Sequence, residues 1–559
     1  MAASTDTAQM TTMLSCPCSS ACELNSIGSF TIPRGASNDD IAAARRDFSQ
    51  REIEDMIIEL DTPLPCPTAT LSCSAIQSAL PSPPDVQKYA SPLRWPKWRK
   101  SIVTWISCVV TCVACYSAGE MSPASAELTA EWGITLTTYN SAVTVFCIGF
   151  GVAPMILATC SEINGRKPVF IGSGIIFCAS TVACGGTRVF AGLLIARLFQ
   201  GIGASTFSTM VGGVISDIYS TEERNIPMAQ FSSAALLGTG LAPLLSSVVV
   251  YHSTWRWVYY SHAIVSGFCV AVMFLFFRET RSTVLLRRKA DALNRYYEEL
   301  EHLGYYGVIF EGTSEVRRIR WRPKDEEQQY SFRQMMKVSC YRPFHMLVTE
   351  PVVFLFSLWL SFGWAVLYLQ FSAVPLVFRT NHNFSTEQIG AVFTAMCCGV
   401  IIITVVSIYQ ERIANHFGLL PKTPEARLYF ACLQAVLVPV GLFWFGWTSF
   451  PSIHWIFPTM AIGCSTMGIF SVYLAVFNYL ADAYGPYASS AIAAQSFCRN
   501  LLGGIFPLIT DTMFTNLGYP AASSLLGGIG AALTLVPWVL VFYGPTIRAK
   551  SRIASIMAT

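Results

Sequence analysis

From about residue 96 onward, long apolar stretches alternate with short polar ones. A stretch of roughly 20 apolar residues can form a helix that crosses the hydrocarbon core of a membrane. Six such stretches lie near 101–120, 138–160, 168–187, 191–212, 228–250 and 258–277. Six more lie near 350–377, 388–409, 427–447, 456–479, 488–510 and 521–543. The pattern predicts an all-α integral membrane protein with twelve transmembrane helices.

The polar segments between these stretches predict five parts. Residues 1–95 are rich in Ser, Thr, Pro and Ala and lack the apolar core of a cleavable signal peptide. We expect them to form a disordered tail with one short helix near Asp47–Leu60. Residues 96–277 and 347–545 form two six-helix bundles, residues 278–346 a central polar loop, and residues 546–559 a second tail.

The distribution of Lys and Arg predicts the orientation. If the first tail is cytoplasmic, most Lys and Arg residues of the connecting segments fall on the inner side, and the outer segments hold only Arg188, Arg256 and Arg379. Both tails and the central loop are therefore expected in the cytoplasm. The glycosylation sequon at Asn383 then falls in an outer loop, as that modification requires.

Composition agrees with a membrane protein and excludes several other classes. Only 13% of the residues are charged, against about a quarter in soluble domains, and the mean hydropathy is +0.46. A net charge of +3 with no basic stripe gives no indication of a nucleic-acid partner. Many cysteines lie inside apolar runs, where Cys acts as a small apolar residue. The cluster Cys16, Cys18 and Cys22 belongs to an unstructured tail or, alternatively, carries reversible palmitoylation.

The motifs of several energy-converting and catalytic sites are absent. The chain contains no phosphate-binding P-loop sequence, and its seven histidines never adopt a metal-binding spacing. No glycine-rich dinucleotide fingerprint follows a predicted strand. We therefore expect no cofactor, no metal and no enzyme activity. If such a membrane protein transports a substrate, it therefore draws its energy from a gradient or is a passive facilitator.

The loop between the second and third helices contains Glu162, Ile163, Gly165, Arg166 and Lys167. It resembles the inner loop of the major facilitator superfamily: Gly165, Arg166 and Lys167 match that pattern, Glu162 stands for its Asp, and Ile163 replaces an Arg. In that family the acid meets the N-terminus of helix 11, here near Tyr487–Ser490, and latches the two bundles together. A carboxylate is stabilised at such a helix end. The alternative is an ordinary basic inner loop.

Helices 4 and 5 carry further resemblances to the same family. Helix 4 matches a stretch in which Arg197 is implied to act in proton coupling and shares a helix face with Gln200. A structural tie to helix 1 or 2 is the alternative. Helix 5 resembles the antiporter motif with departures, since small residues replace some glycines. Its members are Gly238, Ala242, Pro243, Ser246 and Ser247.

The second half narrows the resemblance to one group. Segments 342–351, 424–428 and 477–485, with 279–280 and 285–290 after helix 6, are similar to the fungal twelve-helix drug:proton antiporters. The resemblance covers about residues 90–548 and implies the major facilitator fold. In this fold helices 1, 4, 7 and 10 line a central cavity. Candidate lining residues are Tyr116, Asn140, Arg197, Gln200, Trp364, Tyr368, Gln370, Tyr473 and Asn478.

Three ionisable or polar residues have open roles. Gln495 and Arg499 are one turn apart deep in helix 11, and either contact substrate or anchor a neighbouring helix. Proton coupling needs an acid, and the predicted spans are nearly free of acids. Glu120, at the outer end of helix 1, is the first choice for that acid; the alternative is a solvated helix cap.

These features predict a plasma-membrane exporter of amphipathic organic compounds, driven by protons and working as a monomer. Its partners are a small-molecule substrate, protons and membrane lipid. A polyamine or organic-acid transporter is one alternative. A receptor or scaffold that does not transport is another, from a different class.

Overall fold

The computed structural model describes residues 53–59, 66–67, 83–302, 308–309, 316–323, 332–418 and 423–551. In this part of the chain, twelve helical segments are long and apolar enough to cross a membrane, which confirms the predicted number. Their bounds differ from the predicted ones by a few residues. For example, the seventh span is longer than predicted and covers Pro351–His382.

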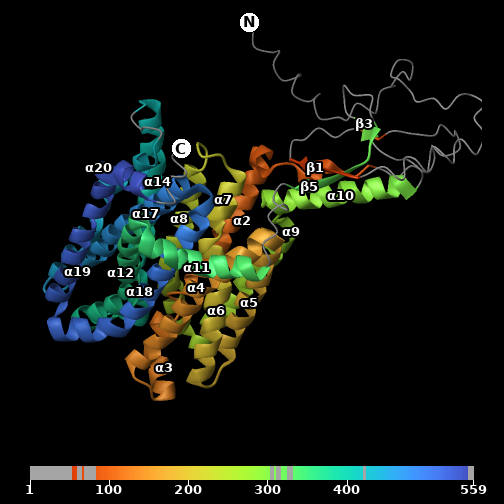
Figure 1. Cartoon of the computed structure of the whole chain (residues 1–559). Coiled ribbons are helices and arrows are strands. Elements are labelled where there is room, and N and C mark those ends of the chain that lie inside the picture. The colour runs from red at the N-terminus through yellow and green to blue at the C-terminus, as the bar shows by residue number, and fades with distance from the viewer. Residues whose placement is uncertain are drawn as a thin grey trace, which may run out of the picture. The chain divides into compact units, whose positions relative to one another are not determined.

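The first bundle is built from six spans (Figure 1). They are α2 (Lys97–Tyr116), α4 (Leu136–Asn164), α5 (Arg166–Gly186), α6 with α7 (Phe190–Thr209 and Val211–Ile218), α8 (Asn225–His252) and α9 (Trp255–Phe276). The short helix α3 (Ser125–Trp132) lies between α2 and α4.

The second bundle repeats this arrangement of six spans. They are α12 (Pro351–His382), α13 with α14 (Thr386–Val392 and Thr394–His416), α15 with α16 (Tyr429–Gln434 and Leu437–Thr448), α17 (Ile456–Tyr484), α18 (Ala488–Leu517), and α19 with α20 (Tyr519–Leu533 and Leu535–Lys550). Pro351 occupies the first turn of α12, and Ser385 and Gln388 form a capping box on α13, both ordinary start signals.

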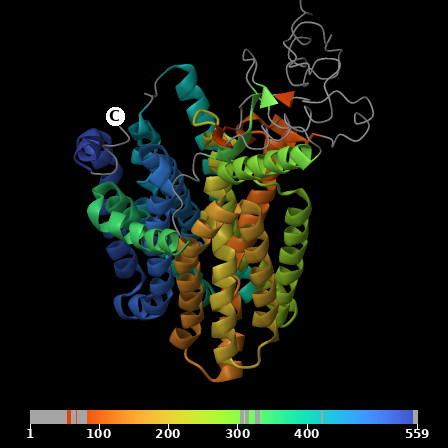
Figure 2. The same cartoon turned by 45° about the vertical axis from the view of Figure 1, so that its right-hand side comes forward.

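The two bundles pack against each other chiefly through α4 with α18 and through α8 with α13 and α14. Small residues allow this approach. A Cβ atom on Gly504 would lie 2.8 Å from the Cβ atom of Cys147, so α4 and α18 touch nearly backbone to backbone. We call the side at which α2 begins and α20 ends the terminal side; Figure 2 shows α3 at the opposite side.

Described residues of the first tail and of the central loop form a second unit, within the ranges 1–89 and 286–326. Strand β1 (Glu54–Ile58) pairs in parallel with β5 (Ile319–Pro323), and β2 (Cys66–Pro67), β3 (Val308–Ile309) and β4 (Val316–Arg317) form a small antiparallel sheet. Ile58, Ile319 and Trp321 pack with residues of α10 (Ser282–His302).

The structure of the first tail and of the central segment corrects two expectations. The predicted short helix near Asp47–Leu60 is wrong for residues 54–58, which form a strand; residues 47–52 and 60 lie outside the described residues. The reason is tertiary, because the partner strand lies more than 250 residues away in sequence. The central polar segment also contains two helices, α10 and α11 (Phe332–Thr349).

One carboxyl group organises the ion pairs of the second unit. Glu301 accepts hydrogen bonds from Arg318 at 2.8 Å and from Arg320 at 2.9 Å. Burial alone would raise the pKa of Glu301, but these hydrogen bonds outweigh it and lower that pKa to about 2. The carboxylate is therefore ionised at all physiological pH values.

Candidate coupling and substrate sites

Glu120 lies in the turn that follows α2 and is 0% exposed. The alternative expectation of a solvated helix cap is wrong. After Tyr116 the chain leaves the helix and packs tightly, since a Cβ atom on Gly119 would lie 2.9 Å from the ring of Phe371. This packing holds Glu120 inside the first bundle, where an unpaired carboxylate would be very costly.

Arg197 on α6 provides the compensating charge. Its Nη1 atom lies 3.0 Å from Oε1 of Glu120, and both side chains are 0% exposed. The same atom donates to the carbonyl of Ser117 at 2.8 Å, and the guanidinium lies 4.7 Å from the ring centroid of Phe146. The structure thus brings together Glu120 and Arg197, which the sequence analysis named separately as candidates for proton coupling.

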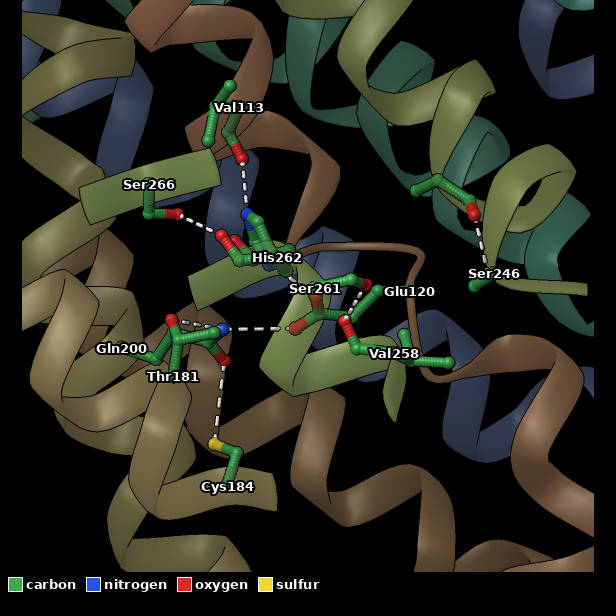
Figure 3. A network of polar contacts seen from close by, with 12 residues as sticks. Val113, Glu120, Thr181, Cys184, Gln200, Ser246, Val258, Ser261, His262 and Ser266 are labelled. Carbon is green, nitrogen blue, oxygen red and sulfur yellow. Dashed lines mark hydrogen bonds and ion pairs between the residues drawn. The ribbon is translucent and has the colours of Figure 1, made fainter. Parts of the chain in front are cut away.

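Gln200 hydrogen bonds to both members of this ion pair (Figure 3), while Nε and Nη2 of Arg197 have no partner among the described residues. Its Nε2 atom donates to Oε1 of Glu120 at 3.0 Å and to the hydroxyl of Thr181 at 3.1 Å. Its Oε1 atom accepts from Arg197 at 2.9 Å. The i, i+3 spacing of Arg197 and Gln200 thus places both groups on the same carboxylate oxygen.

His262 on α9 is the member of this cluster that the sequence analysis did not identify. Its Nδ1 atom lies 2.5 Å from Oε2 of Glu120, and its Nε2 atom lies 2.9 Å from the carbonyl oxygen of Val113. A carbonyl only accepts, so Nε2 carries a hydrogen. The short contact with Glu120 then needs one further proton, held either by the imidazole or by the carboxyl group. A hydrogen bond between Oε2 of Glu120 and Nδ1 of His262 therefore requires a hydrogen on one of these two atoms.

A signal for His262 existed in the sequence. It is an ionisable residue in the interior of a predicted span, and such residues mark functional sites by default. Tyr116, predicted as a cavity residue, also belongs here, because its ring packs edge-on against His262 with centroids 4.8 Å apart. We call Glu120, Arg197, Gln200 and His262 the acid–arginine cluster.

The inner-loop motif forms a compact turn on the terminal side. Gly165 has φ +100°, and a Cβ atom there would lie 2.2 Å from the carboxylate of Glu279. That carboxylate accepts the backbone N–H groups of Arg166 at 2.8 Å and Lys167 at 3.2 Å, and so caps α5. The glycine at this position is required by both the backbone conformation and the space.

Arg166 and Lys167 are tied to the first bundle. The Nε atom of Arg166 lies 3.2 Å from Asp217, and the Nζ atom of Lys167 donates to the carbonyl of Phe274 at 3.0 Å. Glu162 is half-buried and, among the residues that the structure describes, makes no hydrogen bond or ion pair. The contact with the start of α18 that the resemblance implies is not formed in this structure.

Different residues bridge the bundles on the terminal side. Asp482 at the end of α17 contacts Arg224 at 3.4 Å and Arg427 at 3.1 Å. Asn478, predicted as a cavity residue, instead donates to the side chain of Asn225 on α8 at 2.9 Å. These contacts hold α8 of the first bundle against α17 of the second.

The opposite side is bridged as well. Asn140 on α4 donates to the carbonyl of Pro507 on α18 at 2.9 Å, and Ser122 donates to the carbonyl of Phe371 on α12 at 2.6 Å. A cavity of about 140 Å³ lies there, lined in part by Asn140, Phe371 and Asp511. The bundles are thus in contact on both sides of the central region.

A second buried arginine lies on α18 at this interface. Arg499 is 0% exposed, and its guanidinium lies 4.4 Å from the ring centroid of Trp364 and 5.3 Å from that of Tyr473. The two rings stack on each other with centroids 5.2 Å apart. The only hydrogen bond found for its guanidinium among the described residues goes to Ser496 at 3.3 Å.

Further polar atoms of this region lack partners in the described part of the chain. They are Nε and Nη1 of Arg499, both amide atoms of Gln495, Oδ1 of Asn500 and the hydroxyl oxygens of Tyr473 and Ser208. Tyr368 is buried on the same side of α12 and contacts α18 near Gly503. We call Trp364, Tyr473, Gln495 and Arg499 the aromatic–arginine cluster.

The remaining predicted site residues lie outside these two clusters. Gln370 donates to the hydroxyl of Ser465 at 3.0 Å and so joins α12 to α17. Gly238 packs on α2, where a Cβ atom would lie 2.2 Å from the carbonyl of Cys112. Ala242, Pro243 and Ser246 are buried further along α8. Asn383 is exposed and ends α12 with φ +53°, so it is accessible for the predicted glycosylation.

This two-bundle arrangement of membrane-spanning helices defines a secondary-transporter fold, and the comparisons with known proteins agree. A model of the Major Facilitator Superfamily matches residues 107–507, so the chain belongs to this family and is a transporter rather than an enzyme. In solved structures, the fold resembles that of the xylose transporter XylE from E. coli, with a TM-score of 0.56 and 14% identity over 79% of this chain and 98% of that chain.

Its relatives include fungal efflux proteins. The efflux pump atB of Aspergillus terreus is 35% identical over 72% of this chain and 83% of its own length. The multidrug transporter mdrA of Aspergillus fumigatus is 30% identical over 83% of this chain and 74% of its own length. The transporter paaT of Penicillium rubens is 32% identical over 83% and 82%. The resemblance to the fungal efflux group is confirmed.

Proposed function

We propose that this protein is a proton-coupled exporter of small amphipathic organic compounds in the plasma membrane. The observation that carries the proposal is the acid–arginine cluster. It holds a buried acid, Glu120, that is paired with Arg197 and contacts the ring nitrogen Nδ1 of His262. The relatives described as efflux pumps support the direction of transport.

The cluster offers a physical route from proton binding to movement. Protonation of Glu120 removes the charge that holds Arg197, and a buried arginine without its partner costs several kcal/mol. The first bundle then relaxes toward an arrangement in which Arg197 finds another acceptor or water. Release of the proton restores the pair. Protonation of one buried carboxyl group thereby shifts the equilibrium between two arrangements of the bundles.

The contacts between the bundles would be the gates. For the terminal side to open, Asp482 must release Arg224, while the intrabundle contacts of Arg166, Lys167 and Glu279 keep the inner loop intact. The latch between Glu162 and the start of α18 remains a prediction for another state of the cycle. The small residues of α8, from Gly238 to Ser246, let this helix slide against α2.

The orientation proposed from the positive charges also has structural support. Strand β1 belongs to the first tail and β5 to the central loop, and the two strands are hydrogen bonded. A tail on the far side of the membrane would not reach β5. We infer that both tails and the central loop are cytoplasmic.

The rival functions are less well supported. A polyamine transporter needs acids around its substrate, whereas the central buried group of the second bundle is the cation Arg499. A receptor or scaffold has no need of a buried ion pair in the membrane interior. An organic-acid transporter is favoured by Arg499 as a second candidate.

The test uses the full chain in proteoliposomes with a trapped pH indicator and an imposed pH gradient. Wild-type protein should concentrate a fluorescent amphipathic dye against its gradient and alkalinise the acidic compartment, and a protonophore should abolish both. Glu120→Gln should lose both signals. Concentrative uptake by Glu120→Gln at the wild-type rate would contradict the coupling role of Glu120.

A matched control separates coupling from folding. Arg412→Gln removes an exposed arginine of α14, whose guanidinium lies 5.9 Å from the ring centroid of Tyr409, and should behave as wild type. Equal elution volumes in size-exclusion chromatography for all three proteins would show that Glu120→Gln is folded.

A further inference from the structure

The aromatic–arginine cluster contains a charge that nothing in the described protein neutralises. Arg499 is 0% exposed, yet no described Asp or Glu forms an ion pair with it, and two of its three nitrogen atoms lack an acceptor. Buried charges in proteins are normally paired, because desolvation of an unpaired charge is very costly. This site is therefore incomplete without a negatively charged group.

The contacts of Arg499 differ from those of an arginine that ties helices together by hydrogen bonds. A structural arginine ties one helix to another through carbonyl or carboxylate acceptors, whereas the hydrogen bond of Arg499 returns to Ser496 on its own helix. Its contacts with other helices are the faces of Trp364 on α12 and Tyr473 on α17. These rings orient the guanidinium, and its Nε and Nη1 atoms have no acceptor among the described residues.

Neighbouring groups fit the remainder of such a ligand. Gln495 lies one helical turn before Arg499, is 0% exposed, and has an amide without partners in the described residues. Tyr473 adds a buried hydroxyl in the same condition. The stacked rings of Trp364 and Tyr473 supply a flat apolar surface. Together these residues match a molecule with one anionic group, a second polar group and an aromatic body.

We propose that Arg499 is the anion-binding residue of the substrate site, and that the natural substrates are amphipathic organic anions with a planar apolar part. This inference rests on the proposed transport function and specifies its substrate class. The anion pairs with Nε and Nη1 of Arg499, and its ring system lies against the stacked rings. Gln495 acts as a positioning residue that accepts or donates one hydrogen bond.

The two clusters then have separate roles. The acid–arginine cluster in the first bundle takes the proton, and the aromatic–arginine cluster at the face of the second bundle takes the substrate. Because Arg197 already has a carboxylate partner, a second anion gains little there. Arg499 is fully buried and, among the described residues, has no carboxylate partner, so it can still pair with an anion.

The experiment measures equilibrium binding to full-length protein in nanodiscs, without a gradient. The probes are radiolabelled 1-naphthalenesulfonate, 1-naphthoate, the neutral 1-naphthamide and the cationic 1-naphthylmethylammonium, which share one ring system. Wild-type protein should bind both anions about 10- to 100-fold more tightly than the amide, as expected for charge-assisted hydrogen bonds to a buried arginine. The cation should bind weakest. Anions that bind no more tightly than the amide would overturn the proposal.

Variants locate the effect at one residue. Arg499→Gln should lower the affinity for the anions to that of the amide and leave amide binding unchanged, and Arg499→Lys should retain part of the preference. Arg412→Gln is the control and should match wild type. Undiminished anion preference in Arg499→Gln would overturn the assignment. Wild-type selectivity decides the substrate class even if Arg499→Gln fails to fold.

Failure of the proposed function would give a different pattern. If binding is selective for anions but transport ignores the pH gradient, proton coupling is wrong and the anion site stands. If transport follows the gradient but binding does not distinguish the charge of the probes, coupling stands and the anion site is wrong.

Discussion

Two arginines, one in each bundle, are fully buried in the membrane unit and differ in one respect. The Nη1 atom of Arg197 has a carboxylate at 3.0 Å and two further acceptors, and His262 contacts the same acid; Nε and Nη2 of Arg197 have no acceptor in the described residues. Arg499 has two aromatic faces and a single weak hydrogen bond. The two arginines are equally buried but differ in their charge partners, which indicates different roles. A buried ion pair can respond to protonation of its acid, whereas a buried arginine without an acid can bind an anionic ligand.

The largest expected effect comes from giving Arg499 the partner that Arg197 already has. Gln495→Glu places a carboxylate one turn before Arg499, in the favourable order for an acid and a base on one helix. The new ion pair should occupy the guanidinium and weaken binding of 1-naphthalenesulfonate by about 100-fold or more. Equilibrium binding in nanodiscs checks this, with Gln495→Met as the uncharged control. Unchanged anion affinity in Gln495→Glu would contradict the assignment.

Removal of each arginine should have opposite effects on stability. Arg197→Gln leaves Glu120 buried without its main counter-charge and should destabilise the protein by about 3–5 kcal/mol. Arg499→Gln removes an uncompensated charge and should leave the unfolding temperature unchanged or raise it. Thermal unfolding in detergent measures both. An equal loss of stability in the two variants would show that Arg499 has a partner after all.

Removal of Glu120 should restore most of the stability that is lost when Arg197 is removed. In Glu120→Gln/Arg197→Gln no unpaired charge remains, so most of the stability lost in Arg197→Gln should return, while gradient-driven transport stays absent. The same unfolding assay, combined with dye uptake, tests this. Additive destabilisation in the double variant would mean that the two side chains do not act as a pair.

His262 should affect coupling more than binding. His262→Gln keeps a hydrogen-bonding group near Glu120 but cannot be protonated, so gradient-driven uptake should fall by about tenfold, the cost of one charge-assisted hydrogen bond. Exchange of labelled for unlabelled substrate should change little. The ratio of the two rates in proteoliposomes is the readout, and an equal fall in both would assign His262 to folding or binding.

The smallest expected effect concerns the aromatic face. Trp364→Phe retains an apolar ring but weakens the cation–π contact, so affinity for 1-naphthoate should fall by about threefold. The matching change near the first cluster, Phe146→Leu, should leave anion affinity unchanged. A fall of similar size in both variants would point to general repacking.

Much of this molecule is readable from its sequence, and the limits have a physical cause. The membrane spans can be predicted from the length of the apolar stretches. The shared helix face of Arg197 and Gln200 can be predicted from their spacing in the sequence. Glu120 was identified as the acid from its position after a polar turn, although its burial depends on packing against Phe371. His262 meets Glu120 only through the packing of α9 on α2, 142 residues apart in sequence.

The second cluster shows the same limit more sharply. The depth of Gln495 and Arg499 in a span is visible from the sequence, whereas the absence of an acid around Arg499 in the described residues is a tertiary fact. Likewise Asn140 and Asn478, both predicted to line the cavity, bridge the bundles through Pro507 and Asn225. A polar residue is available to a substrate only if groups on neighbouring helices do not already form its hydrogen bonds, and the sequence does not reveal those contacts.

The division of labour between the two clusters is tested most directly by comparing Glu120→Gln and Arg499→Gln in one transport assay. Gradient-driven uptake and exchange of labelled 1-naphthalenesulfonate are measured in parallel with full-length protein in proteoliposomes. We expect Glu120→Gln to lose gradient-driven uptake but keep exchange, and Arg499→Gln to lose both. If Arg499→Gln keeps exchange of the anion while Glu120→Gln loses it, the two clusters do not have the roles proposed for them.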